Sequence, residues 1–244
     1  MDCKNCGTPV EQTFCPKCGQ NISEKRLDFN FFYETFNKKY NPLKSHKTLF
    51  GFFKSPKKTI LDFLDCKRVD ILDPVAVLFL SVGLTILLNS FLEKHTPPKP
   101  KSDVDDIKIW VEMQQMYNDH AALFSFLIII PVSFLTWYFL RKKKFNLSEH
   151  IAINTYLNSY NFLLSLFVTV ISFIEMKLGY THNFSQILSL LIFVYISLIF
   201  SNIIDGKFAF GSFIKYVLAN FFFYFFGIII VILFILTVSA SEQS

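Results

Sequence analysis

The chain of 244 residues is 52% hydrophobic, contains 31 phenylalanines and carries a formal net charge of +5 at neutral pH. A soluble domain of this length alternates polar and apolar residues, because half of its surface meets water. Here the apolar residues form long blocks, which excludes an ordinary soluble globule and indicates a membrane protein. Four of the five cysteines fall within the first eighteen residues, which favours a metal site over disulfides spread through an oxidised domain.

The first predicted unit, residues 1–22, is a metal-binding ribbon. Two Cys-x-x-Cys-Gly motifs separated by eight residues contain Cys3, Cys6, Cys15 and Cys18. Structural zinc takes four tetrahedral ligands, and each motif supplies two thiolates. The segment is too short to bury a core, so metal binding would supply its folding free energy, about 10–16 kcal/mol at neutral pH. The pattern predicts structural zinc; the alternatives are a redox dithiol pair or a metal-free remnant.

Residues 23–73 form a second predicted unit, a basic and aromatic juxtamembrane segment. Aromatic residues recur at helical spacing near its start: Phe29, Phe32, Tyr33 and Phe36. Basic residues surround the apolar face of a later helix: Lys57, Lys58, Lys67 and Arg68. Helices of this composition lie in the plane of an anionic membrane surface. These eight residues are therefore predicted to form a membrane-surface and docking segment, and packing of the same helices on the membrane bundle is a compatible alternative.

Five apolar stretches qualify as membrane spans, since about 20 mostly apolar residues cross roughly 30 Å of hydrocarbon. Within a predicted membrane domain of residues 74–240, they cover residues 74–92, 121–140, 156–176, 185–204 and 216–238. The third span is the most polar. A candidate intramembrane polar cluster comprises Asn154, Asn158 and Asn161, which either bond between helices or line a cavity. The predicted fold class is an all-α polytopic membrane protein with an N-terminal four-cysteine zinc ribbon.

Orientation follows from the Lys and Arg residues between the spans. They number thirteen in residues 1–73, four in residues 141–155 and two in residues 205–215, against four, one and none in the intervening segments. This distribution predicts a cytoplasmic N-terminus and an external C-terminus, as an odd number of spans requires. The polar N-terminus also predicts that no cleavable signal peptide is present.

Several short motifs carry a family resemblance. They are Arg26-Leu27 through Phe36, Thr48-Leu49-Phe50, Ser55-Pro56-Lys57-Lys58-Thr59-Ile60, Asp65-Cys66-Lys67-Arg68-Val69, Asp73-Pro74 and Ser148-Glu149-His150-Ile151-Ala152-Ile153-Asn154-Thr155-Tyr156. Together with the Cys-x-x-Cys-Gly ribbon, these motifs resemble the bacterial family named domain of unknown function 3667, over residues 1–90 and 148–165. The family often has glycine where this chain has Lys57 and Cys66, and both differences affect local turns.

This resemblance implies an architecture, a zinc ribbon followed by a helical membrane domain, but no activity. A ribbon followed by five spans also resembles Yip-type membrane proteins, at the level of topology only. Enzyme or coupled-transport chemistry in a membrane needs ionisable groups at depth, and the central portions of the spans contain none. Glu149 and His150 point about 100° apart on a helix, so we expect Glu149 to cap the third span and His150 to lie in the headgroup layer.

The sequence predicts a non-enzymatic, multi-pass protein of the bacterial inner membrane, whose cytoplasmic zinc ribbon docks or recruits a protein partner. Expected partners are membrane lipids and either a protein partner or a second copy of the chain. Nucleic acid is not expected, because the ribbon lacks a basic stripe, and the sequence identifies no small-molecule substrate. The alternative is a transporter or lipid-handling membrane protein that uses the polar face of the third span.

Overall fold

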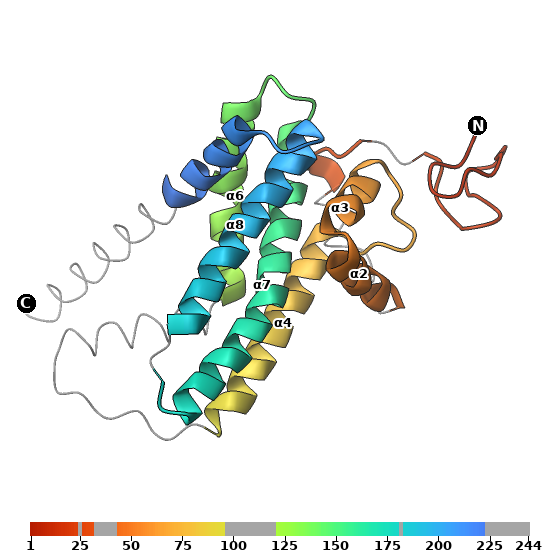
Figure 1. Cartoon of the computed structure of the whole chain (residues 1–244). Helices are drawn as coiled ribbons and strands as arrows, with labels where there is room; N and C mark the ends of the chain where they lie inside the picture. Colours follow the sequence, from red (N-terminus) through yellow and green to blue (C-terminus); the bar gives the residue numbers. More distant parts are fainter. Residues whose placement is uncertain (24–25, 32–42, 96–120, 181–182, 223–244) are drawn as a thin grey trace, which may run out of the picture.

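The structure is a computed structural model, and it describes residues 1–23, 26–31, 43–95, 121–180 and 183–222 (Figure 1). Within these ranges the chain is helical, apart from turns and two isolated β-bridges in the first 21 residues. The all-helical fold class is therefore confirmed.

Four long helices form a bundle. They are α4 (Pro74–Glu93), α6 (Ala121–Leu140), α7 (Leu147–Lys177) and α8 (Asn183–Asp205). Helix α7 packs against the other three, and it runs between α4 and α8 in Figure 1. A further apolar helical segment, Phe210–Phe222, follows α8. The core of the bundle is therefore built around α7, the helix with the most polar of the predicted spans.

Helices α2 (Leu43–Lys54) and α3 (Pro56–Leu64) form a hairpin that packs on the side of the bundle. Phe52 of α2 is fully buried and stacks on Tyr160 of α7, with ring centroids 5.6 Å apart. Phe63 of α3 is buried against Tyr156 of α7, with centroids 5.3 Å apart. The predicted alternative, in which these helices pack on the bundle, is therefore what the described residues show.

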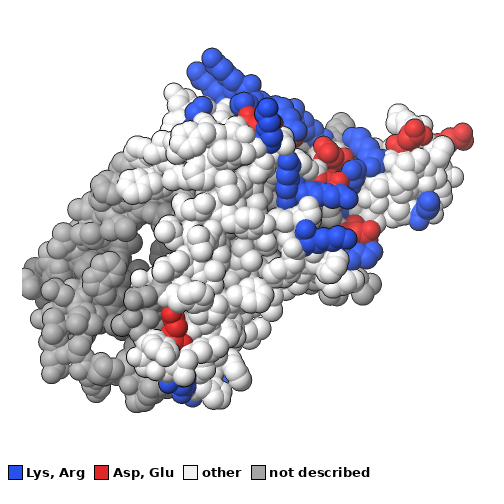
Figure 2. Space-filling view, in the orientation of Figure 1, with Lys and Arg blue, Asp and Glu red and all other residues white. Residues whose placement is uncertain are grey.

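Three helices, α4, α7 and α8, are long and apolar enough to cross a membrane. Large apolar side chains point outward from them: Leu87 is 69% exposed, Phe167 57% and Leu190 63%. Water disfavours so much exposed apolar surface, whereas hydrocarbon accommodates it. In Figure 2 the long middle of the bundle is almost free of charged atoms, and most Lys and Arg gather toward one end. These features identify a membrane protein.

The predicted second span coincides with α6, which has 20 residues, but its first six side chains lie outside the described part. The predicted fifth span is described only as far as Phe222. The structure therefore gives three candidate spans, and the full set of five remains a prediction.

Segments far apart in the sequence meet at one end of the bundle. Lys143, which follows α6, pairs with Asp205 at the end of α8, with Nζ and Oδ1 2.5 Å apart. Nζ of Lys57 in α3 donates to the carbonyl of Gly206 over 2.7 Å. We call this end, formed by the start of α3 and residues 141–146 and 206–209, the basic end. The five predicted spans place these same segments on one side of the membrane, so the structure and the predicted topology agree on which segments lie together.

Helix α7 begins at Leu147, nine residues before the predicted third span. The side chain of Asn146 accepts a hydrogen bond from the Glu149 N–H, and the Glu149 carboxylate accepts one from the Asn146 N–H, both over 2.8 Å. This reciprocal capping box confirms that Glu149 caps the helix. The apolar-span criterion missed the first turns because they are polar and are buried against protein rather than lipid.

The chain leaves α3 through a left-handed turn at Cys66, whose φ is 65°. This is the position at which the family resemblance implied glycine. A side chain in this conformation costs about 1–2 kcal/mol. Cys66 is only 4% exposed, and its Sγ lies 3.8 Å from a guanidinium nitrogen of Arg68, so its sulfur also contributes packing.

We expect Cys66→Gly to be more stable than Cys66→Ala by about 1 kcal/mol, because both lose the sulfur but only glycine relieves the left-handed backbone. Thermal unfolding of the two full-length variants in the same detergent measures this difference. A Cys66→Ala protein at least as stable as Cys66→Gly would contradict the expectation.

Candidate metal centre

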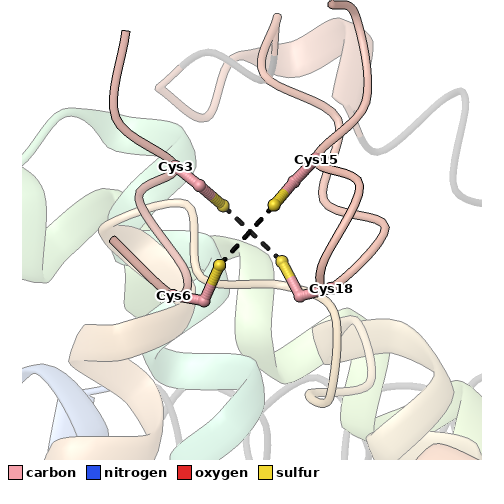
Figure 3. Close-up of side chains that lie close together, drawn as sticks. All are labelled: Cys3, Cys6, Cys15 and Cys18. Atoms are coloured by element: carbon pink, nitrogen blue, oxygen red, sulfur yellow. Dashed lines mark hydrogen bonds between the residues drawn. The ribbon is translucent and has the colours of Figure 1, made fainter. Parts of the chain in front are cut away.

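Four cysteine side chains converge near the N-terminus (Figure 3). Sγ of Cys3 lies 3.6 Å from Sγ of Cys18, Sγ of Cys6 lies 3.6 Å from Sγ of Cys15, and all four sulfurs lie within 4.8 Å of one another. A tetrahedral ion with metal–sulfur bonds of about 2.3 Å separates its ligands by about 3.8 Å. The four predicted ligands therefore form a cluster of the right size to hold one metal ion, and among the described residues no other such cluster occurs.

The ribbon repeats its backbone after twelve residues. The N–H of Gly7 donates to the Cys3 carbonyl, and the N–H of Gly19 donates to the Cys15 carbonyl, both over 2.8 Å. Both glycines have positive φ, 72° and 73°, a conformation that side chains disfavour. Each half thus presents two thiols from one tight turn. The two Cys-x-x-Cys-Gly motifs, offset by twelve residues, carried this signal in the sequence.

The thiols of the cluster differ in acidity. The Thr8 hydroxyl, 3.2 Å from Sγ of Cys6, and the Thr8 N–H lower the pKa of Cys6 to about 6. The Gln20 N–H acts in the same sense on Cys18, but desolvation and the neighbouring cysteines outweigh it and raise the Cys18 pKa to about 11. Thiolates this close repel one another, so the last proton is held tightly. A divalent cation removes that repulsion, and the donor set therefore suits a metal.

A buried arginine joins the ribbon to α3. The side-chain oxygen of Gln20, 3% exposed, accepts a hydrogen bond from the Arg68 N–H over 3.2 Å. The Arg68 guanidinium lies 5.0 Å from the ring centroids of both Phe31 and Phe63, and its Nε donates to the Phe63 carbonyl. Arg68 therefore departs from the predicted membrane surface, because a weakly hydrated, planar guanidinium stacks well between aromatic rings.

The other residues predicted to lie at the membrane surface differ in exposure and in their contacts. Phe29 is 61% exposed and Lys58 is exposed. Nζ of Lys67 lies 2.7 Å from a carboxylate oxygen of Asp62, and this hydrogen bond raises the pKa of Lys67. Lys57 is half-buried and bonds to the chain after α8, as described above. Three aromatic residues lie outside the described ranges: Phe32, Tyr33 and Phe36.

The predicted polar cluster of α7 lies inside the bundle. Nδ2 of Asn154 donates to the hydroxyls of Ser133 and Thr136 in α6, both over 3.1 Å. Asn154, Asn158 and Asn161 together line one cavity. The structure therefore brings the three predicted asparagines to a common site and satisfies both predicted alternatives, an interhelical hydrogen bond and a cavity wall.

The expectation that His150 lies in the headgroup layer is wrong. Its side chain is fully buried, with Nδ1 3.2 Å from Oγ1 of Thr136 in α6. Its ring also contacts those of Phe145 and Phe200. The difference arises because α6, α8 and Phe145 enclose the first turns of α7.

Comparison of the chain with protein-family models, with curated proteins and with solved structures finds no match. The fold and the cysteine cluster therefore define a class: an all-helical membrane protein with an N-terminal four-cysteine site that could hold a metal ion.

Proposed function

We propose that the protein is a non-enzymatic adaptor of the bacterial inner membrane, in which a zinc ribbon recruits a protein partner at the cytoplasmic face. The cysteine cluster carries this proposal. Four thiolates fill a tetrahedral coordination sphere, so zinc held by Cys3, Cys6, Cys15 and Cys18 has no position open for water or substrate. Such an ion would stabilise the fold of the ribbon, and the ribbon projects from the helical bundle (Figure 1).

The ribbon has an exposed apolar surface that suits a protein contact. Met1 is 92% exposed and Phe14 is 57% exposed, although the ribbon buries Val10. Its charges are nearly balanced, with Lys4 and Lys17 offset by acidic neighbours, which does not favour a phosphate backbone. Exposed aromatic anchors dominate the energetics of protein interfaces, so Phe14 is the side chain that we expect to contact the partner.

The proposed orientation has five spans, with the basic end in the cytoplasm and the C-terminus outside. The clustering of residues 26, 57, 143 and 206 at one end supports it, since these residues belong to the segments richest in Lys and Arg. Reporter fusions after Lys144 and after Ser244 test the orientation. We expect a cytoplasmic signal from the first and an external signal from the second; a cytoplasmic signal after Ser244 would mean that the number of spans is even.

Cross-linking from the ribbon tests the adaptor function. A photo-reactive residue at position 14 of the full chain should trap one discrete protein in cells, whereas the same residue at position 12, also exposed, should trap much less. Trapping of a second copy of the chain would identify a homo-oligomer as the partner instead. Phe14→Ala should weaken this complex, measured by how much of the trapped protein co-purifies with the full chain, while Glu11→Ala serves as the matched control.

Removal of residues 1–24 should abolish the cross-linked complex and the cellular phenotype, but leave membrane insertion unchanged. Insertion depends on the apolar helices, whose core begins with Leu27 and does not include the ribbon. If this truncation behaves like the intact chain while substitutions at Asn158 or Asn161 destroy function, the adaptor proposal fails. That result would favour a transporter or lipid-handling protein.

A further inference from the structure

A polar cavity lies within the bundle, apart from the ribbon. It has a volume of about 50 Å³, is partly open, and is lined by residues of α6, α7, α8 and the segment Phe210–Phe222. Four asparagines contribute to its wall: Asn154, Asn158, Asn161 and Asn220. Tyr216 and apolar side chains such as Ile129 and Phe193 form the rest. At about 15 Å³ for each ordered water, a volume of this size holds roughly three waters, or a ligand group of a few heavy atoms.

The hydrogen bonds around Asn154 fix the orientation of its amide. The Ser133 hydroxyl donates to the Ile129 carbonyl over 2.6 Å, and the Thr136 hydroxyl donates to the Ser133 carbonyl over 3.1 Å. Both hydroxyl protons are therefore in use, so each hydroxyl oxygen can only accept from the Asn154 amide. Nδ2 must point to the hydroxyls, and Oδ1 points away from them.

Oδ1 of Asn154 is buried and has no hydrogen-bond partner among the described residues, although the residue is only 4% exposed. An unpaired buried acceptor costs free energy, so such an atom signals a missing donor. The same reasoning makes Nδ1 of His150 a donor to Thr136, because that hydroxyl proton is already engaged. Nε2 of His150 is then a second buried acceptor without a partner in the described part of the chain.

The remaining asparagines extend this surface along α7. Residues 154, 158 and 161 are spaced by four and three, so they lie on one face of the helix. Neither Asn158 nor Asn161 makes a hydrogen bond within the described residues, and Asn220 uses only its Nδ2, which donates to the Tyr216 carbonyl. Among the described residues, the wall of the cavity thus contains several amide groups without hydrogen bonds, and Asn154 contributes an Oδ1 that can only accept. Among the described residues, no Lys, Arg, Asp or Glu lines it, so they offer an ion no counter-charge.

We propose that this cavity binds an uncharged, hydroxyl-bearing group, with Asn154 Oδ1 accepting a hydrogen bond from one hydroxyl and Asn158 contacting another. A free polyol such as glycerol and the glycerol headgroup of a monoacylglycerol share this chemistry. The inference does not rest on the adaptor function, because the ribbon contributes nothing to the cavity.

Two measurements on the full-length chain distinguish the two sources. Glycerol permeation into proteoliposomes, followed by stopped-flow light scattering, detects the free polyol. Native mass spectrometry with 1-monooleoylglycerol detects the lipid, and methyl oleate, which lacks the hydroxyls, is the comparison ligand. A glycerol flux above that of protein-free liposomes, without a lipid adduct, supports the free polyol. An adduct with monooleoylglycerol but not with methyl oleate, without such a flux, supports the lipid headgroup.

Three variants assign either signal to the cavity. Asn158→Leu and Asn154→Leu should reduce it about tenfold, the effect of one lost neutral hydrogen bond. Asn202→Leu is the matched control and should retain the signal. Asn202 lies on α8, is not among the residues that line the cavity, and within the described ranges bonds only the Leu198 carbonyl. Asn158 makes no hydrogen bond to the described residues, so its replacement tests binding without breaking a hydrogen bond among them. The proposal is overturned if the intact protein gives neither signal, or if Asn158→Leu leaves the signal unchanged.

Discussion

The purified full-length chain is expected to contain one zinc per molecule, and Cys15→Ser is expected to remove it. Cys15 is 2% exposed and supplies one of the four clustered sulfurs, so its loss opens the coordination sphere. Zinc supplies about 10–16 kcal/mol to the folding of peptides of this kind, more than a ribbon with so small a core can replace. Elemental analysis measures the metal, and amide hydrogen exchange over residues 1–22 measures the unfolding.

The matched control for zinc binding is Cys66→Ser, because Cys66 lies outside the cluster and should leave the zinc content at one. Acidification should release the metal from the intact chain, since protons compete with zinc for thiolates and affinity falls as the pH falls. The membrane helices should remain inserted in both experiments. Zinc well below one per chain, with all four thiols reduced, would refute the assignment.

Arg26→Ala is expected to destabilise the protein by about 1–3 kcal/mol, because it leaves the buried carboxylate of Glu149 without its cation. Nε and Nη2 of Arg26 each lie 2.6 Å from an oxygen of Glu149, and Nη2 also bonds the Lys144 carbonyl. Glu149 is 4% exposed. Solvent reaches 57% of the Arg26 side chain and screens the pair, and the N-terminus of α7 still favours the carboxylate. We therefore expect less than the loss of a fully buried pair.

Two comparisons isolate this effect. Lys47→Ala breaks the Lys47–Asp70 pair, in which both side chains are 54% exposed, and should change stability by less than about 1 kcal/mol. The double variant Arg26→Ala/Glu149→Gln should be more stable than Arg26→Ala alone, because the unpaired charge is gone. Denaturant unfolding in one detergent measures all three. An Arg26→Ala protein as stable as Lys47→Ala would show that the Arg26–Glu149 pair contributes no more than an exposed ion pair.

The features predicted correctly from the sequence depend on short-range physics. The spacing of Cys3, Cys6, Cys15 and Cys18 determines which sulfurs can meet, because each pair belongs to one turn of backbone. Runs of apolar residues likewise predict α4 and α8, since length and hydrophobicity alone decide whether a helix can cross hydrocarbon. The capping role of Glu149 needed only the sequence around Asn146.

The features that were missed depend on tertiary contacts. The burial of Arg68 requires Phe31, Phe63 and Gln20 to arrive from three different segments. The burial of His150 requires α6 and α8 to close over the start of α7, and nothing in the local sequence distinguishes that from exposure at a membrane surface. The hydroxyl network that orients Asn154 depends on side chains of α6, about twenty positions earlier.

The length of α7 has a mechanical consequence. With 31 residues at 1.5 Å each, the helix is about 46 Å long, whereas the hydrocarbon core is about 30 Å thick. Some ten residues therefore extend beyond the hydrocarbon. The first turn of α7 contacts Arg26, and the α2–α3 hairpin contacts the helix further along, at Tyr156 and Tyr160. A thinner bilayer increases the tilt of such a helix. The α2–α3 hairpin packs on α7, and Arg68 joins the hairpin to the ribbon. A change in the tilt of α7 would therefore change the distance between the ribbon and the membrane surface.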